Sequence, residues 1–357
     1  MSKAKKYKKL TYCSDYDKHT VPIFNACAGS RTVPLLKTLM SSYCMNNCKF
    51  CPFRCNRKYS RERWEPQELA DVTLNLLKKR KIEGLFLSSS VEKDPDLTVE
   101  KQVQTAEILR KKGFKEYIHL RLMPGVSKDL IKRSALLADR VGINIELPDK
   151  SHYEDMKLFL HFKQDILKRI KWLAKEVKKA QKFDKCSAGL DSQIVVGASD
   201  EKDKEIIKIS DMLYNELNAR RVYYSAFHPV KNTPLENKKP ENPWREYRLY
   251  QSSFLLRDYG MTKKDFVFEE SGNLNLKQDP KFVMAKQNEL NIDVNEANFN
   301  ELIKIPGVGL KSAKNIINKR PIKNIHNLKA CGVILKRAQP FIELHGIHQT
   351  HLSKWLS

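Results

Sequence analysis

The sequence predicts an α/β protein with a mostly parallel sheet, followed by a small all-α domain. Six segments of strand character alternate with helical segments between residues 34 and 235, which is the pattern of successive β/α units. A polar stretch marked by prolines, residues 237–243, ends this alternation. Two short amphipathic helical patterns around a glycine turn follow residue 292. The 357 residues suffice for one large domain and one small one.

The first predicted strand is the apolar run 34–40, which is short enough for a buried strand. With it the chain has six β/α units, which fit either an incomplete barrel or an open doubly wound sheet. After the sheet, helices are expected at 244–259 and near 280–288. The remaining strands are expected at 84–87, 117–122, 141–147, 193–197 and 221–227, and the helices between them at 66–79, 98–112, 127–138, 153–183 and 200–219.

Three cysteines, Cys44, Cys48 and Cys51, form a C-x3-C-x2-C cluster after the first strand, and Phe50 precedes the third. Asn and Ser residues around them, and Pro52 after them, predict an irregular loop. This loop leaves the C-terminal end of a strand, where α/β enzymes place their active sites. Three thiolates suit a [4Fe–4S] cluster and leave its fourth iron open to another ligand.

A zinc site is the alternative, with Cys55 as the fourth ligand. All four cysteines would then lie within twelve residues, whereas zinc ligands usually form two separated pairs. A disulfide framework is less favoured, because the eight cysteines come without a signal peptide or an apolar segment of membrane-spanning length. We therefore expect a reducing, cytoplasmic location and no membrane partner.

The charge of the chain is strongly positive. It has 66 Lys and Arg against 42 Asp and Glu, a formal net charge of +24. A surplus of this size favours a polyanionic partner, nucleic acid first. Lysine-rich helical faces that reflect genome composition or thermal adaptation would produce the same surplus. Charge alone therefore leaves the partner open.

A glycine turn, Ile305-Pro306-Gly307-Val308-Gly309, separates the helical patterns 295–304 and 311–319. Glycines there can take positive φ and admit another backbone, and amides at the start of the second helix can face a phosphate. An ordinary helix pair is the alternative. The unit looks like a helix-hairpin-helix, which grips the DNA backbone without reading sequence. The residues expected to contact DNA are Gly307, Val308, Gly309, Lys311 and Lys314.

The cysteine cluster with its preceding aromatic residue resembles the signature of the radical S-adenosylmethionine (radical SAM) superfamily. The resemblance implies an incomplete six-stranded barrel and a [4Fe–4S] cluster held by Cys44, Cys48 and Cys51. It implies that S-adenosylmethionine chelates the open iron and yields a 5′-deoxyadenosyl radical, which abstracts a hydrogen atom. It also implies a low-potential electron donor such as flavodoxin or ferredoxin.

Five further segments resemble one radical SAM subgroup, that of DNA modification or repair proteins with a helix-hairpin-helix. Members of this subgroup tend to be paired with a protein resembling a uracil-DNA glycosylase. We therefore expect a basic N-terminal arm (1–30), the partial barrel (31–235), a linker with accessory helices (236–290) and a helix-hairpin-helix domain (291–357). The segments are 82–90, 138–148, 248–251, 256–260 and 292–297, and the match runs from Tyr16 to Ile342.

The resemblance also implies residues that bind S-adenosylmethionine. Phe50 should pack near the adenine. Ser88-Ser89-Ser90 stands where the superfamily usually has Gly-Gly-Glu, which holds the amino group, so a carboxylate is missing. Serine hydroxyls and backbone carbonyls can accept those hydrogen bonds instead, or Glu92 can substitute.

Two strand residues complete the predicted cofactor site. Asn144 and Glu146 alternate on one strand and so face the same side. A glutamate in an apolar run needs a partner, which is either the cofactor's ribose or ammonium or an ion pair with Arg121. Arg121 can alternatively hold the cofactor's carboxylate. His228 follows the sixth strand and is a weaker candidate proton donor.

Three functions follow from these observations. The first is a radical enzyme that modifies or repairs a nucleotide within double-stranded DNA, with the target extruded from the stack. The second is a radical enzyme that modifies RNA. The third is a DNA-binding iron–sulfur sensor or scaffold without catalysis. The target atom, the fate of S-adenosylmethionine, the oligomeric state and the roles of Cys13, Cys27, Cys55 and Cys186 stay open.

Overall fold

The computed structural model describes residues 23–28, 31–156, 160–344 and 347–348. The chain divides into two compact units. The first comprises residues 1–201 and 216–242, and the second comprises residues 202–215 and 243–357. Within the described ranges, no helix combines the length and the apolar character that crossing a bilayer requires.

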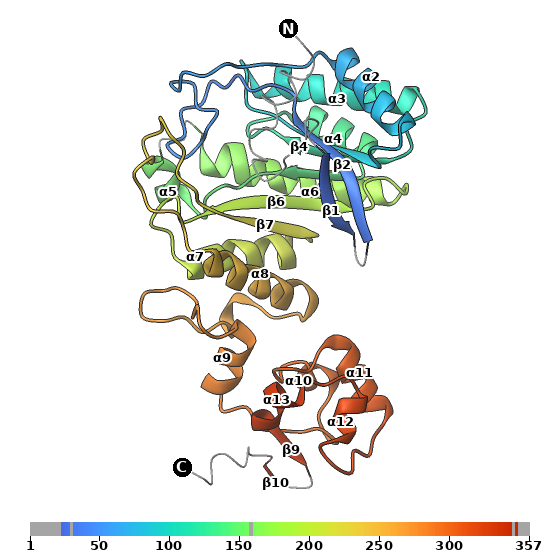
Figure 1. Ribbon diagram of the computed structural model, residues 1–357, viewed down its shortest axis with the longest axis vertical. Helices are drawn as coiled ribbons and strands as arrows, with labels where there is room; N and C mark the ends of the chain where they lie inside the picture. Colours follow the sequence, from blue (N-terminus) through green and yellow to red (C-terminus); the bar gives the residue numbers. More distant parts are fainter. Residues whose placement is uncertain (1–22, 29–30, 157–159, 345–346, 349–357) are drawn as a thin grey trace. The chain divides into compact units, whose positions relative to one another are not determined.

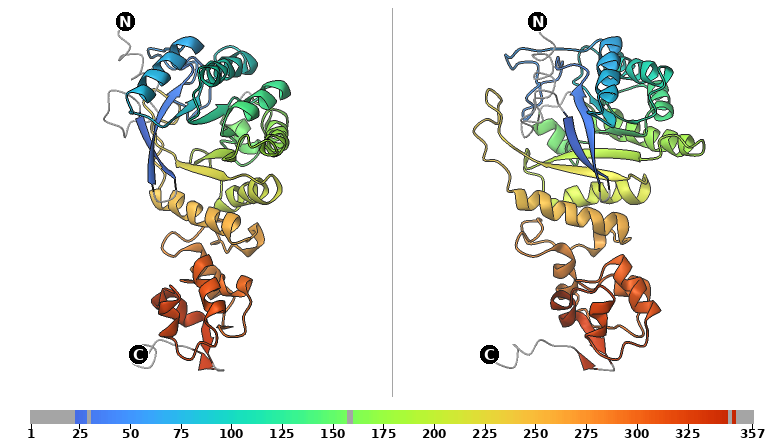
Figure 2. Two further views of the ribbon diagram at one scale, coloured as in Figure 1. Left: turned by 90° about the vertical axis from the view of Figure 1, so that its right-hand side faces the viewer. Right: turned by 45° about the vertical axis from the view of Figure 1, so that its right-hand side comes forward.

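The first unit is built on a curled, seven-stranded sheet that forms part of a barrel (Figures 1 and 2). The strands follow one another in sequence order, and β2 to β7 are parallel. These six parallel strands confirm the incomplete barrel. The strands are β1 (Ile23–Ala28), β2 (Arg31–Leu39), β3 (Gly84–Ser88), β4 (Tyr117–Leu122), β5 (Arg140–Ile143), β6 (Gly189–Val196) and β7 (Arg221–Ala226).

Strand β1 is an addition that the sequence analysis did not predict. It pairs antiparallel with β2 from Ile23 opposite Leu36 to Ala28 opposite Arg31. It therefore forms a hairpin with β2 in residues that were expected to belong to the N-terminal arm. Residues 1–22 of that arm lie outside the described residues.

Helices cover the outer side of the curled sheet (Figure 2). Two of them begin at a proline in the first turn, where a missing N–H costs nothing. In α3 the Asp94 carboxylate also accepts hydrogen bonds from the amides of Asp96 and Leu97. The helices of this unit are α2 (Pro66–Lys78), α3 (Pro95–Lys111), α4 (Lys128–Leu137), α5 (Lys150–Asp155), the π-helix η2 (Phe162–Leu167) and α6 (Lys168–Gln181).

The prediction of one long helix over residues 153–183 was wrong. Helix α5 ends at Asp155, and the carbonyl of Met156 accepts a hydrogen bond from Lys49 of the cysteine loop. A new helical segment starts at Phe162, where the Asp165 carboxylate accepts the amide of His161. These side-chain and loop contacts do not appear in the helical periodicity of the sequence.

The core of the first unit lies between the sheet and its helices. Side chains at alternate strand positions point outward and are completely buried there. Burial of each such aliphatic side chain contributes roughly 1.5–3 kcal/mol. These residues include Leu36, Leu85, Leu87, Ile118, Leu120, Val141 and Ile143.

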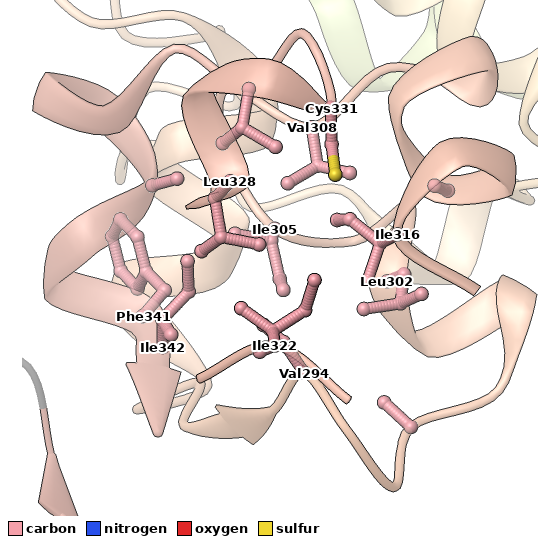
Figure 3. Close-up of a cluster of buried hydrophobic side chains, with 14 of the residues drawn as sticks. Val294, Leu302, Ile305, Val308, Ile316, Ile322, Leu328, Cys331, Phe341 and Ile342 are labelled. Atoms are coloured by element: carbon pink, nitrogen blue, oxygen red, sulfur yellow. The ribbon is translucent and has the colours of Figure 1, made fainter. Parts of the chain in front are cut away.

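The second unit contains helices and a small sheet. Its core gathers side chains from the hairpin region, including Val294, Ile305, Val308 and Cys331 (Figure 3). A three-stranded sheet in the order β10–β9–β8 adds to the predicted helices. The elements are α7 (Asp203–Asp211), η3 (Met212–Glu216), α8 (Pro243–Asp258), η4 (Lys263–Asp265), α9 (Pro280–Gln287), β8 (Ile292–Asp293), α10 (Phe299–Leu302), α11 (Leu310–Asn318), α12 (Asn327–Ala330), α13 (Leu335–Ala338), η5 (Gln339–Phe341), β9 (Ile342–Leu344) and β10 (Ile347–His348).

Candidate functional site

The cysteine loop follows β2 and is fixed by hydrogen bonds to two other parts of the first unit. The amide of Met45 donates to the carbonyl of Val91, just beyond β3 (2.7 Å), and the amide of Lys49 donates to the carbonyl of Met156 (3.2 Å). The Lys49 ammonium also pairs with Asp155 at the end of α5 (3.3 Å). The loop therefore lies at the C-terminal end of the parallel strands, where the sequence placed it.

The thiols of Cys44, Cys48 and Cys51 are partly exposed, and none of them is in a disulfide. Burial raises the pKa of Cys44 and of Cys48, and the neighbouring Cys44 thiol and the Glu146 carboxyl raise the pKa of Cys48 further. Thiolates that are half-buried and repel one another need a cation to form together, which iron bound at this loop would supply. The donor set therefore fits a metal cluster.

The remaining candidates from the sequence are Phe50 and the other cysteines. Phe50 is half-buried, and Cys55 is exposed with its thiol donating to Asn56 (3.3 Å). Cys186 is buried in the interior, which raises the pKa of its thiol to about 12. Cys13 lies outside the described residues, as does the side chain of Cys27.

The serine run leaves β3 beside the end of β2. The carbonyl of Ser88 accepts the amide of Met40 (2.7 Å), and the amide of Ser90 donates to the carbonyl of Ser41 (3.0 Å). The Ser89 hydroxyl accepts the amide of Ser41 (3.2 Å) and donates to the carbonyl of Ser90 (2.8 Å). Within the described part of the chain, the Ser88 hydroxyl makes no hydrogen bond. The Ser90 hydroxyl likewise makes none among the described residues, so two hydroxyls of this run stay available to a ligand.

Glu92, which the sequence offered as a substitute carboxylate, forms an ion pair with Arg63. The Arg63 guanidinium also stacks on Tyr43, 4.5 Å from the ring centre. The Glu92 carboxylate is thus engaged with a cation from the segment that follows the cysteine loop.

Asn144 and Glu146 follow the end of β5, and the Glu146 carboxyl lies close enough to Cys48 to affect its thiol. The Asn144 amide donates to Glu146 (2.8 Å) and its oxygen accepts from Arg121. Arg121 forms its ion pair with Asp191 (2.7 Å), so the predicted pair between Arg121 and Glu146 is not formed. Burial raises the pKa of Glu146, although Asn144 and Arg121 oppose this. Among the described residues, no cation forms an ion pair with Glu146.

Asp191 was missed by the sequence analysis, and it organises the interior of the barrel. Its carboxylate also contacts His119 Nε2 (3.1 Å) and is completely buried. Burial alone would raise the pKa of Asp191, but Arg121 and His119 outweigh it and lower the pKa to about 2. Burial lowers the pKa of His119, which favours its neutral form. The sequence held one signal of this role, an aspartate at a strand position whose side chain faces the barrel interior.

Gly142 makes this arrangement possible. Arg121, Gly142 and Asp191 occupy one register row across β4, β5 and β6. A Cβ atom at position 142 would lie 1.7 Å from Asp191 Oδ1. Because Gly142 has no side chain, the Asp191 carboxylate crosses above β5 and reaches the guanidinium on β4.

The glycine hairpin lies in the second unit between α10 and α11. The Asn298 side chain caps α10, which begins later than the predicted residue 295. Gly307 has φ +84°, and a Cβ there would lie 2.6 Å from the carbonyl oxygen of Ile334, so it provides both properties expected of it. Gly309 instead has φ −94° and forms the N-cap of α11.

The hairpin turn is supported from inside and exposed outside. The Val308 amide donates to Ile305 within the turn (3.0 Å), and the Val308 side chain is buried in the core (Figure 3). The buried Lys281 ammonium donates to the Val308 carbonyl (2.6 Å). Lys311 and Lys314 are exposed on α11. Solvent therefore meets the lysines and the start of α11, while Val308 serves the fold.

Comparisons with known proteins agree with these two sites. A sequence model of the radical SAM superfamily matches residues 38–187, and one of the helix-hairpin-helix motif matches residues 287–337. No curated protein matches the chain.

Solved structures similar to the chain include methylornithine synthase, with 18% identity and a TM-score of 0.49 over 63% of this chain and 62% of that one. They also include the [FeFe]-hydrogenase maturase HydG from Carboxydothermus hydrogenoformans, with 16% identity and a TM-score of 0.48 over 62% and 51% of the two chains. The radical S-adenosylmethionine methyltransferase TsrM from Kitasatospora setae has 12% identity and a TM-score of 0.41 over 57% and 38%. The chain thus spans less than two thirds of each of these proteins.

Proposed function

We propose that this chain, whose residues 38–187 match the radical SAM superfamily, is a radical SAM enzyme that uses a [4Fe–4S] cluster and S-adenosylmethionine and acts on a nucleotide within DNA. The observation that carries the proposal is the second matched motif, a helix-hairpin-helix whose exposed helix start carries two lysines. One chain therefore combines a radical-generating domain with a phosphate-binding module.

The first unit supplies the residues for the cofactors. Cys44, Cys48 and Cys51 would hold three irons of the cluster and leave the fourth to S-adenosylmethionine. When bound, these groups supply a 5′-deoxyadenosyl radical that abstracts hydrogen from an unactivated carbon. Glu146 lies near Cys48 and has no cationic partner among the described residues, so its carboxylate is suited to a cofactor ammonium or ribose. Ser88 offers a hydroxyl at the neighbouring strand end.

Arg121 has a different proposed role from the one the sequence favoured. Its guanidinium is committed to Asp191 and to Asn144. We assign it to holding Asn144, which in turn orients Glu146, in place of direct contact with the cofactor's carboxylate. Phe50 remains the aromatic side chain proposed to pack near the adenine.

The hairpin supplies the contact to DNA. The amides of Gly309 and the following residues lie at the N-terminus of α11, where the helix dipole favours a phosphate. Lys311 and Lys314 add two positive charges on the same face. Contacts of this kind position the protein without selecting a sequence, so the selection of the target falls to the barrel. An electron donor such as flavodoxin or ferredoxin, and a uracil-DNA glycosylase-like partner, remain predictions.

The test uses anaerobically reconstituted protein with dithionite and S-adenosylmethionine. We expect formation of 5′-deoxyadenosine that duplex DNA stimulates more than RNA does, and none from Cys48→Ala. Stimulation by RNA alone would favour the RNA-modifying enzyme. Absence of cleavage with every nucleic acid would favour the non-catalytic sensor.

A second test isolates the hairpin. The double variant Lys311→Glu/Lys314→Glu should bind duplex DNA more weakly and lower the slope of log K against log salt by about 2, because each phosphate contact contributes about 0.9. Lys263→Glu/Lys264→Glu changes the charge by the same amount at two exposed lysines outside the hairpin and is the matched control. An unchanged slope in the double variant would remove the hairpin from the DNA contact.

A further inference from the structure

Arg61, beside the cysteine loop, donates hydrogen bonds to several backbone carbonyls of that loop. Arg61 lies ten residues after Cys51, in the segment that returns from the loop to α2. Its Nη1 donates to the carbonyls of Ser42 (2.7 Å) and Phe53 (2.9 Å), and its Nη2 donates to the carbonyl of Arg54 (2.6 Å). Ser42 precedes the first cysteine by two residues, and Phe53 follows the third by two.

These contacts join the two ends of the cluster-binding segment. A planar guanidinium with five donors can hold several carbonyls in a fixed geometry, which a lysine cannot reproduce. Longer contacts reach the carbonyls of Arg57 (3.3 Å) and Cys55 (3.4 Å). The carbonyls of an irregular loop would otherwise need water or ligand partners.

Tyr59 completes the arrangement. The Arg61 guanidinium stacks on the Tyr59 ring, 4.3 Å from its centre, and Nη1 contacts the phenol oxygen (2.9 Å). The Tyr59 hydroxyl donates to the carbonyl of Ser42 (2.7 Å), the same oxygen that Arg61 holds. The aromatic ring therefore fixes the plane of the guanidinium beside the loop.

The positive charge of Arg61 also lies close to the cysteine cluster. Its guanidinium donates to the carbonyl of Ser42, two residues before Cys44, and to the carbonyl of Phe53, two residues after Cys51. The same residue thus fixes the backbone of the segment and supplies a positive charge near a ligand thiolate.

We propose that Arg61 is a positioning residue for the iron–sulfur cluster, which clasps both ends of the C-x3-C-x2-C segment and contributes positive charge beside Cys44. The clasp sets the spacing of the three thiolates, which favours retention of the cluster. The charge favours the reduced cluster, since reduction adds a negative charge, and so raises its midpoint potential. The inference rests on the cluster and is independent of DNA as the substrate.

The experiment compares Arg61→Lys and Arg61→Gln in the full-length, anaerobically reconstituted protein. Iron per chain should fall at least two-fold in both variants, because both lose the guanidinium fork. The midpoint potential of the cluster that remains should fall in Arg61→Gln and stay near the wild-type value in Arg61→Lys, which keeps the charge. Lys58→Gln removes an exposed charge three residues away and should change neither quantity.

A milder variant keeps the test decisive if the Arg61 variants fail to fold. Tyr59→Phe removes the hydrogen bonds of the phenol to Ser42 and Arg61 but keeps the stacked ring. It should lose iron to a chelator faster than the wild type, with an unchanged potential. Wild-type iron content and chelation rate in these variants would overturn the clasp, and an equal potential in Arg61→Gln and the wild type would overturn the charge effect.

Discussion

The substitution Gly142→Ala is the sharpest test of the buried contacts that Asp191 makes with Arg121 and His119. The added Cβ would lie 1.7 Å from Asp191 Oδ1 and 2.8 Å from the Asp191 backbone oxygen. The backbone has little freedom to move away, because β5 is hydrogen-bonded to β4 on one side and to β6 on the other. The carboxylate must therefore leave its position between His119 and Arg121.

The expected loss of stability follows from the pKa of Asp191. Its pKa lies at about 2 in the folded protein against 3.8 for the free side chain. At 1.36 kcal/mol per unit of pKa, the ionised carboxylate stabilises the fold by roughly 2 kcal/mol at neutral pH. Breaking a buried pair and leaving its charges unpaired typically costs about 3–5 kcal/mol. Gly142→Ala should therefore lower the free energy of unfolding by about 2–5 kcal/mol.

The assay is urea unfolding of the apoprotein at pH 7 in a double-mutant cycle with Asp191→Ala. If Gly142→Ala acts by displacing the carboxylate, most of its cost should vanish when position 191 has no carboxylate. We expect a coupling energy of about 2 kcal/mol between the two changes. Additive effects, or a loss below about 0.5 kcal/mol in Gly142→Ala, would refute the reasoning.

Three further predictions concern titration and the cofactor. Because the folded pKa of Asp191 is depressed, its stabilisation is present above about pH 4 and is lost as the pH falls through about 2. Acid unfolding of Asp191→Asn should therefore lack this loss of stability. An acid transition identical to that of the wild type would contradict the prediction. Burial lowers the pKa of Lys281 from 10.5 to about 7, so wild-type stability should rise between pH 7 and 10 while Lys281→Met shows no such slope in thermal unfolding. Glu146→Gln should weaken S-adenosylmethionine binding about ten-fold in calorimetry at unchanged iron content, whereas wild-type affinity would remove Glu146 from the cofactor site.

The sequence predicted the large elements of the fold because each carries a local signal. Apolar runs marked β2 to β7, and helical periodicity marked α2, α3 and α4. Strand β1 was not predicted, because the alternation of polar and apolar residues within it does not reveal its pairing with β2. The break in the predicted helix 153–183 was also missed, because it depends on the contact between His161 and Asp165 and on a contact from the cysteine loop.

In the candidate site, too, the sequence predicted some of the residues and missed others. The three cysteines were predictable, since metal ligands close in sequence share a spacing. The partner of Arg121 was not, because Asp191 lies seventy residues away and reaches it only across Gly142. Arg61 was also missed, because a guanidinium that serves backbone carbonyls leaves no pattern in the sequence. Sequence spacing identifies ligands, whereas the residues that position them emerge from the fold.

The central claim is that the radical chemistry of this chain acts on DNA. The most direct measurement incubates the reconstituted enzyme with dithionite, S-adenosylmethionine and a duplex DNA library, followed by digestion and mass spectrometry of the nucleosides. We predict a nucleoside of altered mass that appears together with 5′-deoxyadenosine and is absent with Cys48→Ala. Formation of 5′-deoxyadenosine that DNA does not stimulate, with every nucleoside unchanged, would contradict the claim.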